Sequence, residues 1–174
     1  MIDEKRIFYY CPKCGSKMEK KIIADRERDY CPKCGYINYV NPYPAVAGIG
    51  IYKGKILLIQ RGIEPAKGSW APVSGFVEYE EDPEIALLRE MEEEAGVKHA
   101  KVLKCLGAWT DWTPTYGNVI TMVYLVELEN NKVKAGDDAS NVDFFSLDEV
   151  PEMRFKCFKN AFDILKKERE KWNL

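Results

Sequence analysis

Apolar and polar positions separate a long C-terminal stretch of regular pattern from a shorter N-terminal stretch. Apolar runs of strand length, rich in β-branched residues, fall at 45–52, 55–60, 102–109, 119–128 and 143–146. The pattern also predicts helices over 83–95 and 158–170, the second with an amphipathic apolar stripe. Strands interspersed with two helices indicate an α/β fold in which a mixed sheet is covered on both faces.

The N-terminal stretch has a different pattern. Two short aromatic segments, Phe8–Tyr10 and Tyr36–Tyr39, predict brief strands on either side of a charged loop at 19–29. The two prolines in residues 41–44 make a stiff, extended connector, which marks a boundary. We therefore expect two domains, residues 1–41 and residues 42–174.

Paired Cys-x-x-Cys motifs mark the smaller domain as a metal site. Two copies of Cys-Pro-Lys-Cys-Gly, with sixteen residues between Cys14 and Cys31, place four thiols at Cys11, Cys14, Cys31 and Cys34. This spacing is typical of a four-thiolate zinc site, and so short a domain needs a metal to hold it together. Iron in a rubredoxin-like site and disulfides are the alternatives.

Composition limits the classes of protein to which the chain can belong. It has 174 residues, 46% of them hydrophobic, and a net charge of −2, so it can bury a core and has no general attraction to nucleic acid or acidic membranes. No apolar run reaches the length of a membrane span, and the charged start MIDEKRIFYY lacks a secretion signal. We therefore expect a cytoplasmic protein. Cys105 and Cys157 have apolar neighbours, which predicts that both are buried.

Residues 83–95 have the start, the end and the apolar side of a helix. Asp82 is a good N-cap, Pro83 suits the first turn, and Gly96 suits the position after the last turn. The apolar side is expected to contain Leu88, Met91 and Ala95, with Ile85 and Leu87 at its edges.

The other side of this helix gathers negative charge. At about 100° per residue, Glu90, Glu93 and Glu94 project within one arc. Carboxylates at these spacings repel one another and weaken an isolated helix. A hard divalent cation such as Mg²⁺ would remove the repulsion, because it prefers carboxylate oxygens. A solvated acidic face is the alternative.

The spacing around these acids resembles a known motif. The chain matches G-x5-E-x7-R-E-U-x-E-E-x-G-U, where U is apolar, at Gly75, Glu81, Arg89, Glu90, Met91, Glu93, Glu94, Gly96 and Val97. This segment resembles the Nudix box of the Nudix hydrolases, and the resemblance extends over about 44–165. It implies a Nudix-type α/β/α sandwich after the zinc ribbon, and an enzyme that hydrolyses a diphosphate linked to another moiety.

The resemblance also implies roles for individual residues. A Mg²⁺ or Mn²⁺ ion, which would screen the diphosphate and position water, is expected on Glu90, Glu93, Glu94 and the carbonyl of Gly75. Arg89 can pair with Glu93 and keep the cluster in register. Glu81 is expected to orient the cluster without binding the metal.

Two further groups are candidates for the reaction site. Asp137 and Asp138 lie in the kind of loop that supplies the base in several Nudix enzymes, and Asp138 is our candidate. A turn that uses these aspartates for local backbone bonds is one alternative, and Glu90 or Glu93 as the base is another. Arg61 follows a predicted strand and is a candidate phosphate ligand, with a solvated charge as the alternative.

Residues after the box bear on the substrate. A four-cysteine ribbon joined to a Nudix domain resembles the NADH pyrophosphatases, although residues 108–116 replace the Ser-Gln-Pro-Trp-Pro-Phe-Pro stretch of that group. Pro114 lies near the position of a proline in relatives that prefer ADP-ribose, and related ribbon proteins act on FAD. Trp112 and Tyr116 are expected to stack on the nucleotide, and Trp109 to pack in the core. The resemblance thus implies hydrolysis of ADP-ribose, FAD or NADH with release of AMP.

Two other classes of function fit parts of the sequence. The larger domain could be a nucleotide sensor, although a sensor has no need of a complete acid cluster. The ribbon could bind nucleic acid, although its acidic residues dilute the charge of its lysines and arginines. Ribbon-bearing relatives are often dimers, which implies a homodimer.

Overall fold

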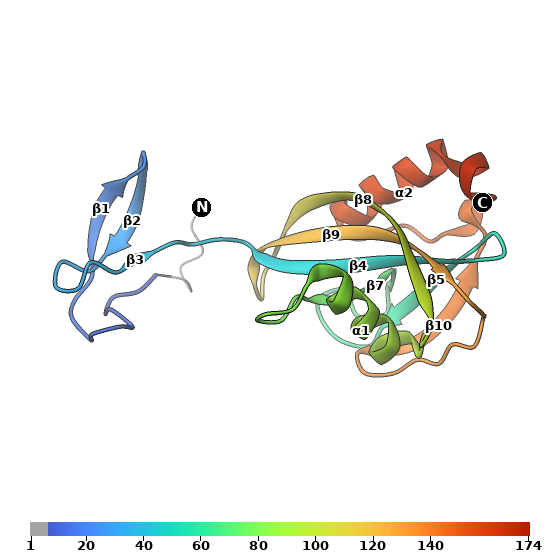
Figure 1. Cartoon of the computed structure of the whole chain (residues 1–174), viewed down its shortest axis with the longest axis horizontal. Coiled ribbons are helices and arrows are strands. Elements are labelled where there is room, and N and C mark those ends of the chain that lie inside the picture. Colours follow the sequence, from blue (N-terminus) through green and yellow to red (C-terminus); the bar gives the residue numbers. More distant parts are fainter. Residues whose placement is uncertain (1–6) are drawn as a thin grey trace. The chain divides into compact units, whose positions relative to one another are not determined.

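The computed structural model describes residues 7–174, which form two compact units that divide between Asn41 and Pro42 (Figure 1). The smaller unit contains a three-stranded sheet in the order β1-β2-β3, built from β1 (Glu19–Ile23), β2 (Arg26–Tyr30) and β3 (Ile37–Asn38). In the part of the chain that the structure describes, no helix is long and apolar enough to cross a membrane.

Two predictions for the smaller unit are wrong. Residues 19–29 were expected to be a charged loop, but they form most of the antiparallel β1–β2 hairpin, with Ala24 and Asp25 at positive φ in a two-residue turn. Its strands carry charged, exposed side chains, so they lack the apolar alternation that marks a half-buried strand. The expected strand at Phe8–Tyr10 is reduced to a single bridge between Tyr10 and Lys17.

The larger unit is built on one mixed sheet. Its main path runs β10-β5-β4-β9-β8, while β6 pairs with β5 and β7 pairs with β4. The strands β4 and β9 are parallel to each other, and the other pairs are antiparallel. The strands are β4 (Tyr43–Tyr52), β5 (Lys55–Arg61), β6 (Trp70–Ala71), β7 (Val73–Phe76), β8 (Ala100–Thr113), β9 (Gly117–Leu128) and β10 (Ala139–Phe145).

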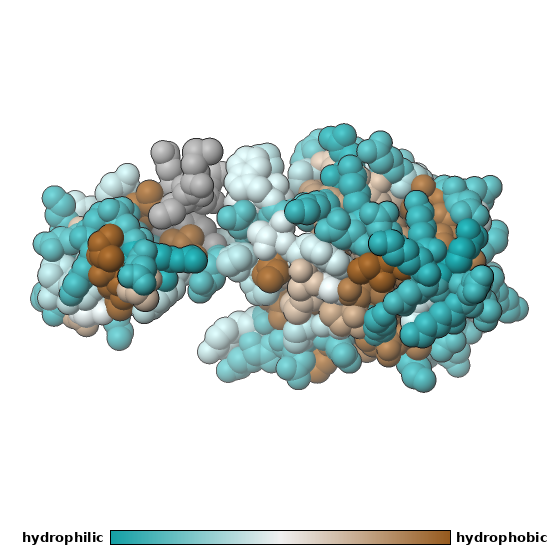
Figure 2. All heavy atoms as spheres, turned by 90° about the horizontal axis from the view of Figure 1, so that it is seen from above, coloured by the Kyte–Doolittle hydropathy of each residue, from teal (hydrophilic) through white to brown (hydrophobic). Residues whose placement is uncertain are grey.

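Helices cover the two faces of this sheet, as the sequence predicted (Figure 1). The helix α1 (Pro83–Ala95) packs on one face through Leu87 and Met91, and Gly48 of β4 leaves room for both side chains. The helix α2 (Lys156–Lys167) packs on the other face through Phe158, Phe162 and Leu165. The helix that was expected at 158–170 therefore begins and ends earlier than predicted. Two 3-10 turns, η2 (Leu147–Glu149) and η3 (Arg169–Trp172), lie before and after it. Figure 2 shows hydrophilic residues over much of the face that it draws.

The orientation of α1 differs from the expected one. Leu88 is 38% exposed and Ile85 is 59% exposed, whereas Glu94 is buried with only 3% of its surface accessible. The helix therefore turns part of its acidic arc toward the protein. Pro83 and Gly96 occupy the predicted ends, but the Asp82 side chain makes no capping hydrogen bond within residues 7–174.

Candidate active site

Most of the predicted site residues of the larger unit line one cavity of about 350 Å³. This volume lies in the range of small-molecule sites in proteins. The cavity is bounded by β7, by α1, by the loops after β5 and before β10, and by β8, β9 and the segment that enters α2. The predicted residues that line it are Arg61, Gly75, Arg89, Glu90, Glu93, Glu94, Tyr116 and Asp138.

Arg89 is the centre of an ion-pair network at the edge of the cavity. Its guanidinium donates to both carboxylate oxygens of Glu81 at 2.9 Å, to Glu90 at 2.7 Å and to Glu93 at 3.0 Å. A further bond of 3.0 Å reaches the carbonyl of Phe76 at the end of β7. The hydrogen bond from Arg89 holds the pKa of Glu81 below its usual value. Arg89 therefore ties three carboxylates of the site to the strand beside them.

Glu94 and Glu90 are the carboxylates that burial affects most. Burial raises the pKa of Glu94 to about 7, although the backbone N–H of Ser74 donates to it at 3.0 Å. Burial also raises the pKa of Glu90, against the opposing effect of Arg89. Two partly desolvated anions that face one cavity would gain from a bound cation, because a positive charge offsets the cost of desolvation.

The loop that carries Asp137 and Asp138 is fastened to the end of α1. The N–H of Gly136 donates to the carbonyl of Glu94 at 3.1 Å, and a Cβ on Gly136 would lie 2.6 Å from the carbonyl oxygen of Glu93. On its other side, the Asp138 carbonyl accepts a bond of 2.7 Å from the N–H of Gly62. Both aspartates line the cavity, so this loop is held against the acid cluster.

Arg61 lies at the end of β5 with its guanidinium held at one nitrogen. Its Nε donates to the carbonyl of Pro65 at 2.8 Å, within the loop that walls the cavity. Its charge lowers the pKa of Glu94, against the larger effect of burial. Within residues 7–174 the described side-chain bond of Arg61 is the one from Nε, so its two terminal nitrogens can donate to an anion, since a guanidinium has five N–H donors.

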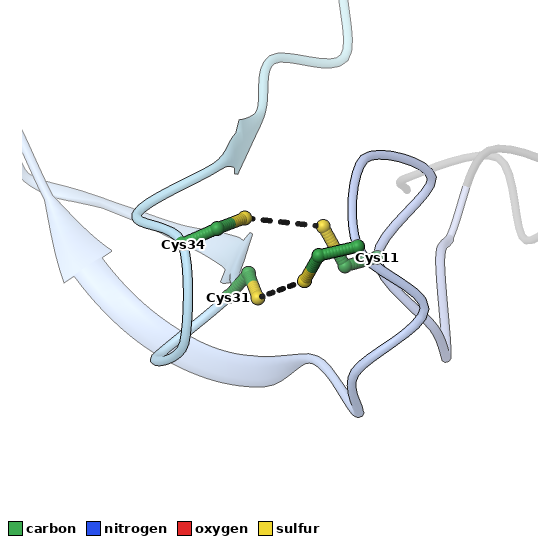
Figure 3. A group of neighbouring side chains, drawn as sticks. Cys11, Cys31 and Cys34 are labelled. Carbon is green, nitrogen blue, oxygen red and sulfur yellow. Dashed lines mark hydrogen bonds between the residues drawn. The ribbon is translucent and has the colours of Figure 1, made fainter.

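The four predicted zinc ligands converge in the smaller unit. The sulfurs of Cys11, Cys14, Cys31 and Cys34 all lie within 4.8 Å of one another. The Cys11–Cys34 and Cys14–Cys31 sulfur pairs are 3.5 and 3.6 Å apart (Figure 3). A tetrahedral zinc–thiolate site requires sulfur separations of about 3.8 Å. A backbone hydrogen bond from Ser16 lowers the pKa of Cys14 to about 6, which favours the thiolate that binds metal.

Within residues 7–174, all six cysteines are free. A disulfide-bonded ribbon is therefore not the arrangement of this structure. Cys157 is buried, as predicted, but Cys105 is exposed, so that prediction is wrong. Cys105 lies on β8 at the edge of the sheet, where the sequence pattern does not reveal which face is covered.

Comparison with known families agrees with this geometry. A family model described as "NUDIX domain" matches residues 42–165, and one described as "Nudix N-terminal", a zinc ribbon, matches residues 9–40. The chain belongs to the Nudix family. It is a Nudix hydrolase with an N-terminal zinc ribbon, which confirms the predicted enzyme class and the predicted α/β architecture.

Individual Nudix proteins are similar over most of the chain. An ADP-ribose pyrophosphatase of Methanocaldococcus jannaschii is 39% identical over 154 residues, which cover 87% of each protein. The structure of a NUDIX hydrolase from Nitrosomonas europaea matches with a TM-score of 0.80 and 26% identity, over 94% of this chain and 93% of that one. A bifunctional NMN adenylyltransferase/ADP ribose pyrophosphatase from Francisella tularensis shares the fold, with a TM-score of 0.59 and 23% identity, over 75% of this chain and 42% of that one.

The strand before the Nudix helix presents a backbone carbonyl that the sequence did not indicate. Gly75 pairs with Val46 in the β4–β7 ladder, and Val77 donates to the carbonyl of Pro44 at 3.1 Å. Hydrogen bonding alternates along an antiparallel pair, so Gly75 points its carbonyl toward β4 while Ser74 points both backbone groups away. The bond from Ser74 N–H to Glu94 agrees with this alternation. The Ser74 carbonyl therefore joins the candidate metal ligands.

The donor set of the Nudix box fits a hard divalent cation. It consists of carboxylate and carbonyl oxygens, which Mg²⁺ and Mn²⁺ prefer. Among residues 7–174, the ligand atoms that lie within 4.8 Å of one another are the four ribbon thiols. The carboxylates of α1 lie farther apart, because Glu90 and Glu93 bind Arg89. Glu90, Glu93 and Glu94 all line the cavity and are the side chains that would hold the ion.

The aromatic residues after the Nudix box have different surroundings: some lie on β8 and one lies in the turn that follows it. Trp112 is 67% exposed, and neither it nor Pro114 is among the described residues that line the cavity. The strand continues to Thr113, so side-chain alternation places Asp111 and Thr113 on the cavity side and Trp112 on the opposite face. Trp109 packs against the core, as expected. Tyr116 lines the cavity, with its ring 4.9 Å from that of Phe76.

Several cavity residues of the Nudix domain were missed by the sequence reasoning. Phe76, Asp111, Thr121, Phe155 and Phe158 line the cavity from β7, β8, β9 and the start of α2. None of them is a fixed position of a recognisable motif, and they meet only because the sheet brings these segments together. Had the strand been predicted to extend to Thr113, side-chain alternation would have placed Asp111 and Trp112 on opposite faces of β8.

Gly75 provides a test of the position of Glu90. A Cβ on Gly75 would collide with the carboxylate of Glu90, which is the mobile end of a side chain. We expect Gly75→Ala to fold normally but to displace Glu90 and lower kcat by about tenfold to a hundredfold. Steady-state kinetics, with a thermal melt as the folding control, measure both effects. Wild-type kcat in Gly75→Ala would show that the position of Glu90 is unimportant.

Proposed function

We propose that this Nudix hydrolase is a Mg²⁺- or Mn²⁺-dependent pyrophosphatase that cleaves an ADP-linked diphosphate, with ADP-ribose as the first candidate, and releases AMP. The observation that carries the proposal is that buried Glu94 and partly buried Glu90 share one cavity with Arg61. This combination suits a polyanion bound through a cation. The similarity to an ADP-ribose pyrophosphatase over 87% of the chain supports the choice of substrate. FAD and NADH are the other candidates.

The residues of the cavity divide the work of hydrolysis. A bound divalent cation would supply charge neutralisation for the diphosphate and acidify a water molecule. Glu90, Glu93 and Glu94 would hold it together with the Ser74 carbonyl. The Gly75 carbonyl, which was the expected ligand, points toward β4 instead. Arg61 would bind phosphate oxygens.

The remaining roles concern orientation and proton transfer. Arg89 and Glu81 would keep the carboxylates in position through the network they form. Asp138, held beside the cluster by its loop, is our candidate for the base that takes a proton from the attacking water. Glu93 is the alternative base, since its carboxylate is half-exposed.

The other predictions made from the sequence concern the substrate-binding aromatic residues, the zinc ribbon, the location and the oligomeric state. Tyr116 is retained as a stacking residue, but Trp112 and Pro114 are not part of the cavity wall that the described residues form. Zinc on the four ribbon thiols and a cytoplasmic location are proposed together, because reduced cysteines persist in that compartment. The homodimer stays a prediction.

A substrate panel tests the proposed function. The purified, zinc-loaded full chain is incubated with Mg²⁺ and ADP-ribose, FAD, NADH or ADP-glucose, and nucleotide products are separated by chromatography. We expect AMP from at least one compound, with the highest kcat/KM for ADP-ribose. Binding of these nucleotides without hydrolysis would instead identify a nucleotide sensor, and neither binding nor hydrolysis would reject both functions.

The raised pKa of Glu94 predicts a pH-dependent effect of Mg²⁺. Folding takes up a proton on a carboxyl whose pKa rises from 4.5 to about 7, so metal-free protein loses stability as the pH rises through that window. Mg²⁺ binds the ionised form, and its stabilising effect must therefore grow over the same range. We expect a larger Mg²⁺-induced increase in Tm at about pH 8 than at about pH 5. An increase that is equal at both pH values would contradict the assignment.

A further inference from the structure

The wall of the cavity opposite α1 carries a charge that the hydrolysis does not use. This wall is formed by β8, β9 and the segment entering α2, and its buried members include Thr113, Thr121 and Phe158. Among the described residues that this wall contributes to the cavity, Asp111 is the charged one. An isolated carboxylate in an otherwise neutral wall of a polyanion site needs an explanation, because it repels the phosphates.

Asp111 is fixed in place by the first turn of α2. Its two carboxylate oxygens each accept one backbone N–H, from Lys156 and from Cys157, both at 2.9 Å. The N-cap residue of α2 is Phe155, whose side chain provides no capping bond in the described structure, so Asp111 supplies the cap from β8. These bonds hold the carboxylate rigidly at the cavity wall.

The cap leaves acceptor capacity on the carboxylate of Asp111. An ionised carboxylate has about four acceptor positions; the two α2 N–H bonds occupy two of them, and the Cys157 thiol also approaches this carboxylate, which leaves at least one position open. A ligand can satisfy what remains only with O–H or N–H donors. A neutral group that offers hydroxyls beside the aromatic rings of Phe155 and Phe158, such as a ribose, meets this requirement. A phosphate at the same place meets a negative charge in a partly buried wall.

We propose that Asp111 is a specificity-determining residue that accepts hydrogen bonds from the hydroxyls of one ribose of the substrate and excludes that ribose when it is phosphorylated. This inference rests on the proposed function, since it concerns the moieties that flank the cleaved diphosphate. Arg61 and the acidic cluster select the diphosphate, whereas Asp111 selects an unphosphorylated sugar beside it.

The test compares three substrates that differ by one phosphate. ADP-ribose carries no extra phosphate. In 2′-phospho-ADP-ribose the extra phosphate is on the adenosine ribose, and in ADP-ribose 1″-phosphate it is on the distal ribose. We expect the wild-type enzyme to discriminate against one phosphorylated compound by about tenfold or more in kcat/KM. That compound identifies the ribose that lies at Asp111. Asp111→Asn should raise KM for ADP-ribose and reduce this discrimination by about tenfold.

A control variant separates recognition from helix capping. Lys156→Pro removes one of the two N–H donors to Asp111 but keeps the carboxylate, and proline is well tolerated at the first helical position. The ratio of two kcat/KM values does not depend on how much of a preparation is folded. We therefore expect Lys156→Pro to keep the wild-type ratios, even where its Tm falls.

The outcomes distinguish this inference from the proposed function. Unchanged ratios in Asp111→Asn, with ADP-ribose still hydrolysed, would mean that Asp111 only caps α2 and would overturn the inference alone. Altered ratios in Lys156→Pro as large as those in Asp111→Asn would also overturn it, because capping would then explain the effect. If the wild-type enzyme hydrolyses none of the three compounds, the assignment of Asp111 fails, and the proposed function fails with it if FAD and NADH are also left intact.

Discussion

Replacement of Glu94 by glutamine is expected to lower kcat by about a hundredfold to a thousandfold, because the variant lacks the buried charge that would hold the divalent cation. Glutamine has nearly the same shape, and its carbonyl oxygen can still accept the bond from Ser74 N–H. Glu94 is 3% exposed and its burial opposes ionisation, so the neutral side chain does not weaken the fold. We therefore expect folded protein that binds nucleotide but turns it over slowly.

Glu92 provides the matched control on the same helix. Its side chain is exposed and lies off the acidic arc, so Glu92→Gln removes the same charge from α1 without touching the cavity. The measurements are kcat and KM with ADP-ribose, nucleotide binding by calorimetry, and a thermal melt with and without Mg²⁺. Glu94→Gln should lose the Mg²⁺-dependent increase in Tm, and Glu92→Gln should keep it. Equal activity of the two variants would remove Glu94 from the mechanism.

Local spacing explains why the acidic cluster could be predicted. Positions three and four apart on a helix face the same way, so the pairing of Arg89 with Glu93 follows from the sequence once the helix is assigned. The further bonds of Arg89 to Glu81 and to the Phe76 carbonyl depend on the turn between β7 and α1. Periodicity does not describe such a turn.

The cavity wall opposite α1 shows where sequence reasoning ends. Asp111 and Trp112 are neighbours, and the aromatic residue was the natural candidate for a nucleotide. The length of β8 decides between them, because one residue of offset reverses the face of every side chain. The α2 cap on Asp111 joins residues about 45 positions apart, a contact that no local pattern encodes. The substrate-facing half of the site is therefore formed by segments that are distant in the sequence. The metal-facing half is formed mainly by one helix, whose periodicity the sequence shows.

Loss of the ribbon metal is expected to unfold the smaller unit and leave the Nudix domain folded. The apolar core of the ribbon consists of Cys11, Met18 and Cys31, with Tyr36 packed against it. Burial of a few side chains contributes only a few kcal/mol, whereas structural zinc contributes about 10–16 kcal/mol in zinc-finger peptides. The larger unit has two extensive core clusters of its own, which do not depend on the metal.

The predicted variant is Cys31→Ser, which replaces a fully buried ligand, and the matched control is Cys105→Ser, which changes an exposed thiol outside the ribbon. We expect Cys31→Ser to lose bound zinc and to be cleaved by protease within residues 7–41, while Cys105→Ser keeps about one zinc per chain. Metal analysis and limited proteolysis of the full chain measure these effects. A ribbon that stays protease-resistant without metal would contradict the prediction, because the small core would then be sufficient to hold the fold.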